Sequence, residues 1–127
     1  MHLILVRHAK AAPGEPDALR PLTHEGHEAA LALGDRFAAL APDAVVSSPL
    51  LRARQTAEPI AAAAGVTAET DVRLAPGASA DDLRAVIDGR GDTVIAVGHQ
   101  PDCSEIVLAL TGRKVGFSVG SFQEIEL

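Results

Sequence analysis

Two apolar segments that each run into a histidine constrain this chain most. Leu3–Val6 is followed directly by Arg7 and His8, and Thr93–Val97 is followed by Gly98 and His99. Short, unbroken runs of branched apolar residues are typical of strands that are buried on both faces of a parallel sheet. Parallel strands end at a common edge, where open α/β folds bind their ligands. The second segment therefore favours a shared site over the alternative that one strand merely ends in polar residues.

Between these two segments, strand and helix patterns alternate. Ser48 is a plausible helix N-cap with Pro49 at the first helical position, and Gly65 is a plausible helix end. We expect helices over residues 24–40, 48–64, 79–87 and 101–110, further strands at 44–47 and 66–72, and one or two short edge strands within 115–127. This order predicts the α/β fold class, as a three-layer α/β/α sandwich with a mainly parallel sheet. A chain of 127 residues has room for a single domain, 1–127.

Composition excludes several function classes. A net charge of −6 argues against a broad surface that binds nucleic acid or anionic membranes. An aromatic content of 2% leaves no stacking platform for single-stranded nucleic acid. Cys103 is the only cysteine, so neither an internal disulfide nor a cysteine-pair zinc site is possible. The apolar runs are too short to cross a bilayer and the first residues lack a signal-peptide pattern. We expect a cytoplasmic protein that binds neither nucleic acid nor membrane.

Arginines accompany the two histidines. Arg7, Arg20, Arg52 and Arg54 lie near predicted strand ends or at a helix start, although Arg54 should point away from the face that carries Arg52. Guanidinium groups offer fixed N–H forks to phosphate oxygens, and helix N-termini add backbone donors. The sequence lacks the glycine-rich loops GxxxxGK[ST] and GxGxxG. We therefore expect a site for a phosphate-like dianion that is not built on a nucleotide-binding loop.

Four strings in the same order resemble the histidine phosphatase superfamily, which has a phosphoglycerate mutase-like fold. They are LVRHAKA at Leu5–Ala11, RPLTHEG at Arg20–Gly26, SSPLLRARQT at Ser47–Thr56 and VGH at Val97–His99. Within that superfamily, the short chain and the RHA string in place of RHG are similar to SixA-type phosphohistidine phosphatases. The resemblance spans nearly the whole chain, and four spaced motifs together are far more specific than RHA alone.

The resemblance implies the role of each site residue. His8 would be the nucleophile and become transiently phosphorylated, while Arg7, Arg52 and His99 would hold the phosphoryl oxygens and Arg20 would belong to the pocket. A neutral imidazole is a competent nucleophile near pH 7, and a covalent intermediate divides the transfer into two displacements. The scheme implies no metal and no cofactor. Ser48 is expected to be a helix cap that could also touch the ligand.

The chain departs from larger family members in one respect that bears on the substrate. Those proteins carry a proton-donating acid after the third strand, whereas residues 74–79 here contain none. An alkoxide leaving group needs such a proton, but a protonated imidazole does not. The departure favours phosphohistidine in a partner protein, with inorganic phosphate as product. Asp71, Asp81 or Asp82 could still supply a proton, which leaves a small-molecule phosphomonoesterase open, and a phosphate-binding module without turnover is a third alternative.

The other candidate residues receive ordinary structural interpretations. We expect His2, His24 and His27 at the surface or rim, and Cys103 as a small buried residue of the last helix. Asp81 and Asp82 are expected to be first-turn acids of a helix capped by Ser79. Larger relatives place a phosphate-binding polar residue after the histidine string, and Lys10 and Ala11 stand there.

Overall fold

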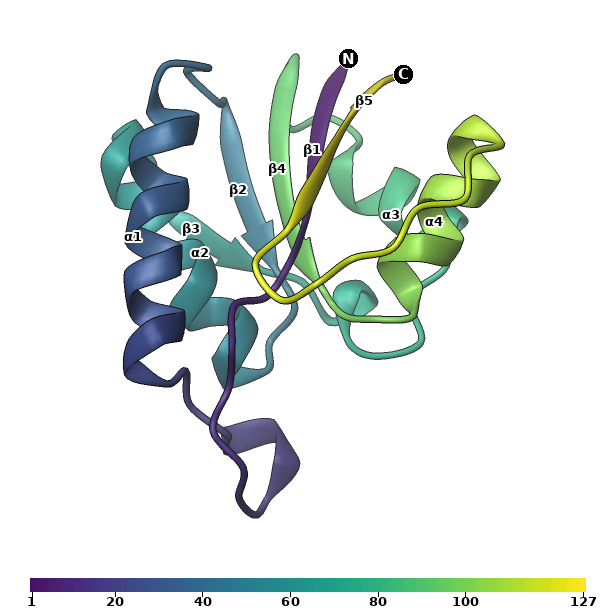
Figure 1. Ribbon diagram of the computed structural model, residues 1–127. Helices are drawn as coiled ribbons and strands as arrows, with labels where there is room; N and C mark the ends of the chain where they lie inside the picture. The colour runs from purple at the N-terminus through teal and green to yellow at the C-terminus, as the bar shows by residue number, and fades with distance from the viewer.

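The computed structural model describes residues 1–127 and contains one central sheet with helices on both sides (Figure 1). The strands are β1 His2–Arg7, β2 Ala44–Ser47, β3 Ala68–Thr70, β4 Thr93–Gly98 and β5 Phe122–Glu126. The helices are α1 His24–Ala38, α2 Leu51–Ala64, α3 Ala80–Ile87 and α4 Asp102–Thr111, with short 3₁₀ turns η1 Asp17–Leu19 and η2 Val72–Leu74. None of the helices is long and apolar enough to cross a membrane.

The sheet has the strand order β3-β2-β4-β1-β5. Its first four strands are parallel and β5 runs antiparallel to β1 at the edge. β4 lies between β2 and β1, so the two histidine-bearing strands are direct neighbours, with Arg7 opposite Gly98. The α/β class and the mainly parallel sheet predicted from the sequence are confirmed.

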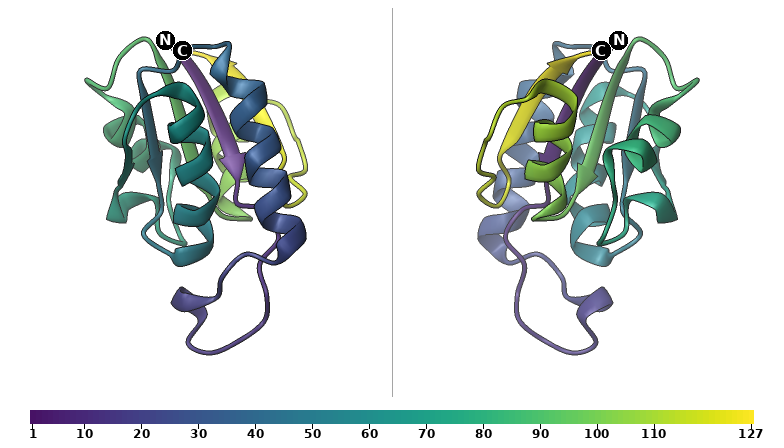
Figure 2. Two further views of the ribbon diagram at one scale, coloured as in Figure 1. Left: turned by 90° about the vertical axis from the view of Figure 1, so that its left-hand side faces the viewer. Right: turned by 90° about the vertical axis from the view of Figure 1, so that its right-hand side faces the viewer.

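Two hydrophobic clusters occupy the two faces of this sheet. Successive strand residues alternate between them: Ile4 and Val6 pack with α1 and α2, while Leu3 and Leu5 pack with α3 and α4. The pair α1 and α2 and the pair α3 and α4 lie on opposite sides of the strands in both side views (Figure 2). On the α1 side, Phe37 meets the ring of Phe122 edge-on, with 4.8 Å between ring centroids. This packing holds the strand ends in place from both faces.

Most predicted helix boundaries agree with the structure, and α2 is the exception. It begins at Leu51 rather than at Ser48, and its N-cap position, Leu50, makes no side-chain capping bond. The Ser48 amide donates to the carbonyl of Val97 at 3.0 Å, so the chain stays extended beyond β2 before it turns. Thr23 caps α1, and Ser79 caps α3 as predicted.

The C-terminal region forms one edge strand, β5, and residues 115–119 are irregular. That irregular segment braces the end of β1 instead of extending the sheet. The carbonyl of Phe117 accepts from the Arg7 guanidinium at 2.8 Å, and the Gly120 amide donates to the carbonyls of Arg7 and His8. β3 covers only residues 68–70 of the predicted 66–72, because its partner β2 is four residues long and Asp71 already caps η2.

Candidate active site

His8 and His99 meet at the carboxyl edge of the sheet. The His8 amide donates to the carbonyl of Gly98 at 3.0 Å, which continues the pairing of β1 with β4 by one residue. The ring centroids are 5.2 Å apart and the rings are tilted by 57°. Both residues are buried, with exposed fractions of 8% for His8 and 3% for His99. The structure thus brings together the two histidines that the sequence placed at separate strand ends.

One ring nitrogen of His8 is committed to the backbone. Nδ1 lies 2.7 Å from the carbonyl oxygen of Ala9, which can only accept, so Nδ1 carries the proton. Burial lowers the pKa of His8 below its usual value, and the charges of Arg52, Arg7 and Arg20 act in the same direction against the Ala9 hydrogen bond. The ring is therefore neutral near pH 7, with its lone pair on Nε2 available for attack.

His99 is hydrogen-bonded to Ser48 through Nε2. Its Nε2 lies 2.8 Å from Ser48 Oγ, and that oxygen also accepts from the Leu50 amide at 3.2 Å. A hydroxyl hydrogen donated from Ser48 to Nε2 would give the same tautomer as in His8 and place the ring hydrogen of His99 on Nδ1. That nitrogen is buried without a partner. Burial, followed by the charges of His8 and Arg52, lowers the pKa of His99 to about 4, so the ring is neutral near pH 7.

Three arginines surround the histidines, each held by a carbonyl. Arg52, in the first turn of α2, donates to the carbonyl of Asp17 at 2.9 Å. Arg20 donates through Nε to the carbonyl of Ala12 at 2.9 Å. The Nε of Arg7 is buried without a partner. Guanidinium groups fixed in this way still present further N–H groups to an anion.

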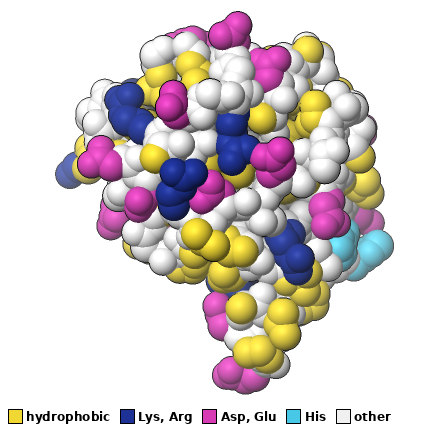
Figure 3. Space-filling model, turned by 180° about the vertical axis from the view of Figure 1, so that it is seen from behind, with side chains coloured by type: hydrophobic (Ala, Val, Ile, Leu, Met, Phe, Trp, Pro, Cys, Tyr) yellow, Lys and Arg dark blue, Asp and Glu magenta, His cyan; other side chains and the backbone are white.

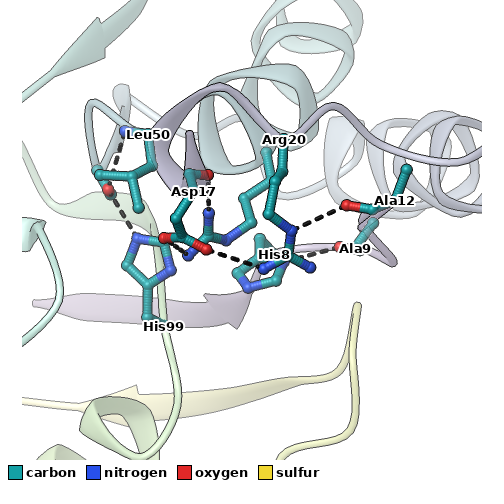
Figure 4. A network of polar contacts seen from close by, with 9 residues as sticks. His8, Ala9, Ala12, Asp17, Arg20, Leu50 and His99 are labelled. Carbon is teal, nitrogen blue, oxygen red and sulfur yellow. Dashed lines mark hydrogen bonds and ion pairs between the residues drawn. The ribbon is translucent and has the colours of Figure 1, made fainter. Parts of the chain in front are cut away.

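A pocket of about 380 Å³ encloses these groups at the surface. Figure 4 shows His8, His99, Asp17 and Arg20 facing one another. The pocket is lined by Arg7, His8, Lys10, Ala11, Asp17, Arg20, Arg52, Pro76, His99, Gln100 and Val119. A cavity of about 390 Å³ elsewhere is lined by Arg54 and Glu58, so volume does not identify the site. The site is identified instead by the lowered pKa values of its two histidines and by its clustered cationic side chains.

None of the three carboxyl groups proposed as proton donors lines this pocket. Asp71 pairs with Arg73 at 2.7 Å and with Arg90 at 3.7 Å, and hydrogen bonds from Arg73 lower its pKa to about 2. Asp82 completes the capping box of α3, and Asp81 is exposed in the first turn of the same helix. All three serve their own local elements, so the sequence-based suggestion that one of them reaches the site is wrong.

The pocket does contain one carboxylate, which the sequence analysis missed. Asp17, in η1, bridges two arginines: Oδ1 lies 3.0 Å from Arg20 Nη1 and Oδ2 lies 3.2 Å from Arg52 Nη2. Hydrogen bonds from Arg20 and then Arg52 lower the pKa of Asp17, which is therefore ionised at neutral pH. Its position three residues before Arg20 is the only sequence signal that could have drawn attention to it.

Two further residues that support the site were also missed. The buried hydroxyl of Thr56 accepts from the Ala9 amide at 3.0 Å and donates to the carbonyl of Arg52 at 2.8 Å. It ties the segment after His8 to the first turn of α2. Gln55 accepts from the Leu22 amide at 2.8 Å and anchors the end of the Arg20 loop. Both residues belong to the same ten-residue string as Arg52, so that string could have drawn attention to them.

The remaining candidates lie outside the pocket, apart from Lys10 and Ala11. His2 lies 3.9 Å from Glu124, His24 pairs with Glu28, and His27 is exposed on α1. Cys103 is buried, which raises its pKa to about 12 and makes it a poor nucleophile. No group of three or more His, Cys, Asp or Glu side chains has the arrangement to hold a metal ion.

Comparison with known proteins identifies relatives over the whole chain. Residues 3–76 match the family described as the histidine phosphatase superfamily (branch 1). An uncharacterized protein of Picosynechococcus sp. is 34% identical over 126 residues, which cover 91% of this chain and 76% of that protein. The structure of the protein histidine phosphatase SixA complexed with tungstate is 25% identical, with a TM-score of 0.87 over 100% of this chain and 88% of that one.

A third similarity concerns the fold alone. The mycobacterial glucosyl-3-phosphoglycerate phosphatase is 18% identical, with a TM-score of 0.80 over 98% of this chain and 90% of that one. Proteins with these two different named substrates share one three-layer architecture with this chain. Architecture therefore does not decide the substrate, which has to be argued from the pocket itself.

Proposed function

Because this chain belongs to the histidine phosphatase superfamily (branch 1), we propose that it is a phosphatase that removes the phosphoryl group from phosphohistidine in a partner protein. His8 is the nucleophile and carries the phosphoryl group between two displacements. Arg7, Arg52 and His99 hold the phosphoryl oxygens, and Arg20 completes the pocket. The proposal needs no metal or cofactor, because the arginines supply the positive charge.

The observation that carries the choice of substrate is the state of the only carboxyl group lining the pocket. Asp17 is hydrogen-bonded to two guanidinium groups and is ionised at neutral pH, so it has no proton to give. An alkoxide that leaves from a sugar phosphate needs a proton from a nearby acid. A leaving group that already carries its proton does not, and the ring of phosphohistidine is such a group.

The first displacement then balances without an external acid. The lone pair of His8 Nε2 forms a bond to phosphorus while the P–N bond of the substrate breaks and its electron pair returns to the substrate ring. The substrate ring is protonated at its other nitrogen and leaves as neutral imidazole. His8 keeps the Nδ1 proton that it donates to Ala9, and it becomes a phosphorylated imidazolium. One phosphoimidazolium is exchanged for another, so the step is close to balanced in energy.

The second displacement returns the enzyme to its starting state. Water attacks phosphorus, the P–N bond breaks, and the electron pair returns to His8 Nε2. Both hydrogens of the water stay on the product, which leaves as dihydrogen phosphate. The Ala9 carbonyl holds the His8 proton on Nδ1 through both steps, 2.7 Å away, and so keeps Nε2 as the reacting nitrogen.

Fixed donors stabilise the charge that develops on the phosphoryl oxygens. Arg52 retains unused N–H groups at the start of α2, and both Arg7 Nε and His99 Nδ1 are buried without a partner. Such donors are already oriented before the substrate arrives, which is the main contribution that a protein makes to phosphoryl transfer. Ser48 contributes by keeping the His99 hydrogen on Nδ1 rather than by contacting the substrate.

Apolar side chains around the pocket support a protein substrate. Val119 lines the pocket and is 43% exposed, and Leu19 in the segment before Arg20 is 60% exposed. The segment between β1 and α1 protrudes from the body of the molecule, and hydrophobic side chains cover much of it above an acidic tip (Figure 3). A free sugar phosphate would leave such a surface uncovered, whereas a partner protein would bury it.

The direct test is a substrate panel. Phosphate release is measured from a phosphohistidine-bearing protein, from free phosphohistidine and from sugar phosphates, in the presence of a chelator, for wild type and His8→Ala. The proposal predicts the highest kcat/KM on the phosphohistidine protein and no turnover by the variant. Higher kcat/KM on the sugar phosphates would contradict the proposed substrate and require a proton donor that the pocket does not hold.

A further inference from the structure

The phosphate pocket carries a strong excess of positive charge that one residue offsets. Arg7, Lys10, Arg20 and Arg52 line it, both histidines are neutral, and Asp17 is its only acidic side chain. A negative charge beside a dianion site opposes binding of the dianion. A carboxylate in this place therefore calls for an explanation other than affinity for phosphate.

The contacts of Asp17 fix the direction of two guanidinium groups. Each carboxylate oxygen accepts from a different arginine, at 3.0 Å from Arg20 and at 3.2 Å from Arg52. The main-chain carbonyl of Asp17 accepts from the second terminal nitrogen of Arg52 at 2.9 Å. Arg52 is thus held at both terminal nitrogens by one residue, which removes most of its rotational freedom.

These contacts leave the arginines able to bind a phosphoryl group. A guanidinium has five N–H donors. Arg52 uses its terminal nitrogens once each, and Arg20 uses Nε and one terminal nitrogen. Most donors of each group stay free, so Asp17 does not have to withdraw when the substrate enters.

The exposure of Asp17 separates this role from a contribution to the fold. Its side chain is 63% exposed, and η1 buries no residue at all. Ion pairs at such exposed positions add little to the stability of a protein. What the carboxylate does control is the orientation of Arg52, whose side chain is only 9% exposed and faces the two histidines.

We propose that Asp17 is a positioning residue of this phosphatase: it aligns Arg20 and Arg52 for the phosphoryl oxygens and weakens the hold of the pocket on the phosphate product. The inference rests on the proposed function for the reaction it serves. The carboxylate costs some affinity for the ground-state anion, and in return the guanidinium groups are oriented before the transition state forms and the product departs faster.

The test compares Asp17→Asn and Asp17→Ala with wild type and with Glu15→Gln, which removes an exposed acid from the same loop. Asparagine keeps the shape and one oxygen acceptor without the charge. We expect kcat on phosphohistidine to fall about tenfold for Asp17→Asn and up to about 100-fold for Asp17→Ala. The Kd of inorganic phosphate should fall about fivefold in both, the effect of one unit charge a few ångströms away in water. Glu15→Gln and all melting temperatures should match wild type.

The two readouts separate this inference from the proposed function. If wild type released no phosphate from phosphohistidine, the proposed function would fail, but calorimetric titration with inorganic phosphate would still report on Asp17. Weaker phosphate binding in Asp17→Asn, or a kcat within twofold of wild type in both Asp17 variants, would overturn the positioning role. A fall in kcat that merely followed a fall in melting temperature would overturn it as well.

Discussion

Replacing His99 with glutamine should remove a measurable part of the pH dependence of folding stability. In the folded protein the pKa of His99 is about 4, whereas an unfolded histidine has a pKa of about 6.5. Between these values the unfolded chain binds more protons, so the free energy of unfolding falls as pH falls through this window. For this group alone, linkage gives a loss of about 2 kcal/mol between pH 7 and pH 5. The His99→Gln variant lacks the group and should lose about that much less.

Urea unfolding at pH 7, 6 and 5 measures this difference. His24→Gln is the matched control, because it makes the same substitution at a histidine whose side chain is 87% exposed on α1 and lies outside the pocket. Carboxyl groups with lowered pKa, such as Asp71, contribute equally in all three proteins and cancel in the comparison. Equal slopes for wild type and His99→Gln would show that burial does not lower the pKa of His99 in the folded protein and would refute this reasoning.

Three further substitutions test the supports of the site and of the fold. Ser48→Ala removes the hydroxyl that is hydrogen-bonded to His99 Nε2. Steady-state assays should show a kcat about tenfold lower, and calorimetry should show a melting temperature close to that of wild type. Gly26→Ala would place a methyl group 2.2 Å from the carbonyl oxygen of Lys10, and urea titration should show a loss of roughly 1–3 kcal/mol in unfolding free energy. Ser79→Ala breaks the capping box of α3 and should cost about 1 kcal/mol by the same titration without changing kcat, since α3 contributes nothing to the pocket.

The part of the site that lies on regular structure was predictable from the sequence. His8 and His99 each follow an apolar strand, and parallel strands deliver their last residues to a common edge. Arg52 falls in the first turn of the helix after β2 and so reaches that same edge. In each case the position follows from a periodic pattern along a few neighbouring residues. Pattern and resemblance agreed on these residues, and the structure brings them into one pocket.

The part that depends on contacts between distant loops was not predictable. Asp17 lies in an irregular segment without periodicity, and its partner Arg52 is 35 residues further along the chain. Ser48 has the residue type of a helix cap, yet the chain continues extended beyond it and its hydroxyl serves His99 instead. Asp71 and Asp82 lie in the part of the sequence where a proton donor was sought. Only the structure shows that Asp71 forms an ion pair and that Asp82 takes part in a helix cap.

The central claim is that the phosphoryl group passes through His8, and rapid quenching tests it most directly. A phosphohistidine-bearing protein is mixed with wild type or His8→Ala, quenched in alkali within milliseconds to seconds, and digested for mass spectrometry. The account predicts a phosphoryl group on the peptide that contains His8, labile in acid, which forms and decays at rates consistent with kcat and is absent from the variant. Phosphate release by wild type without a phosphorylated His8, or sustained turnover by His8→Ala, would contradict the account.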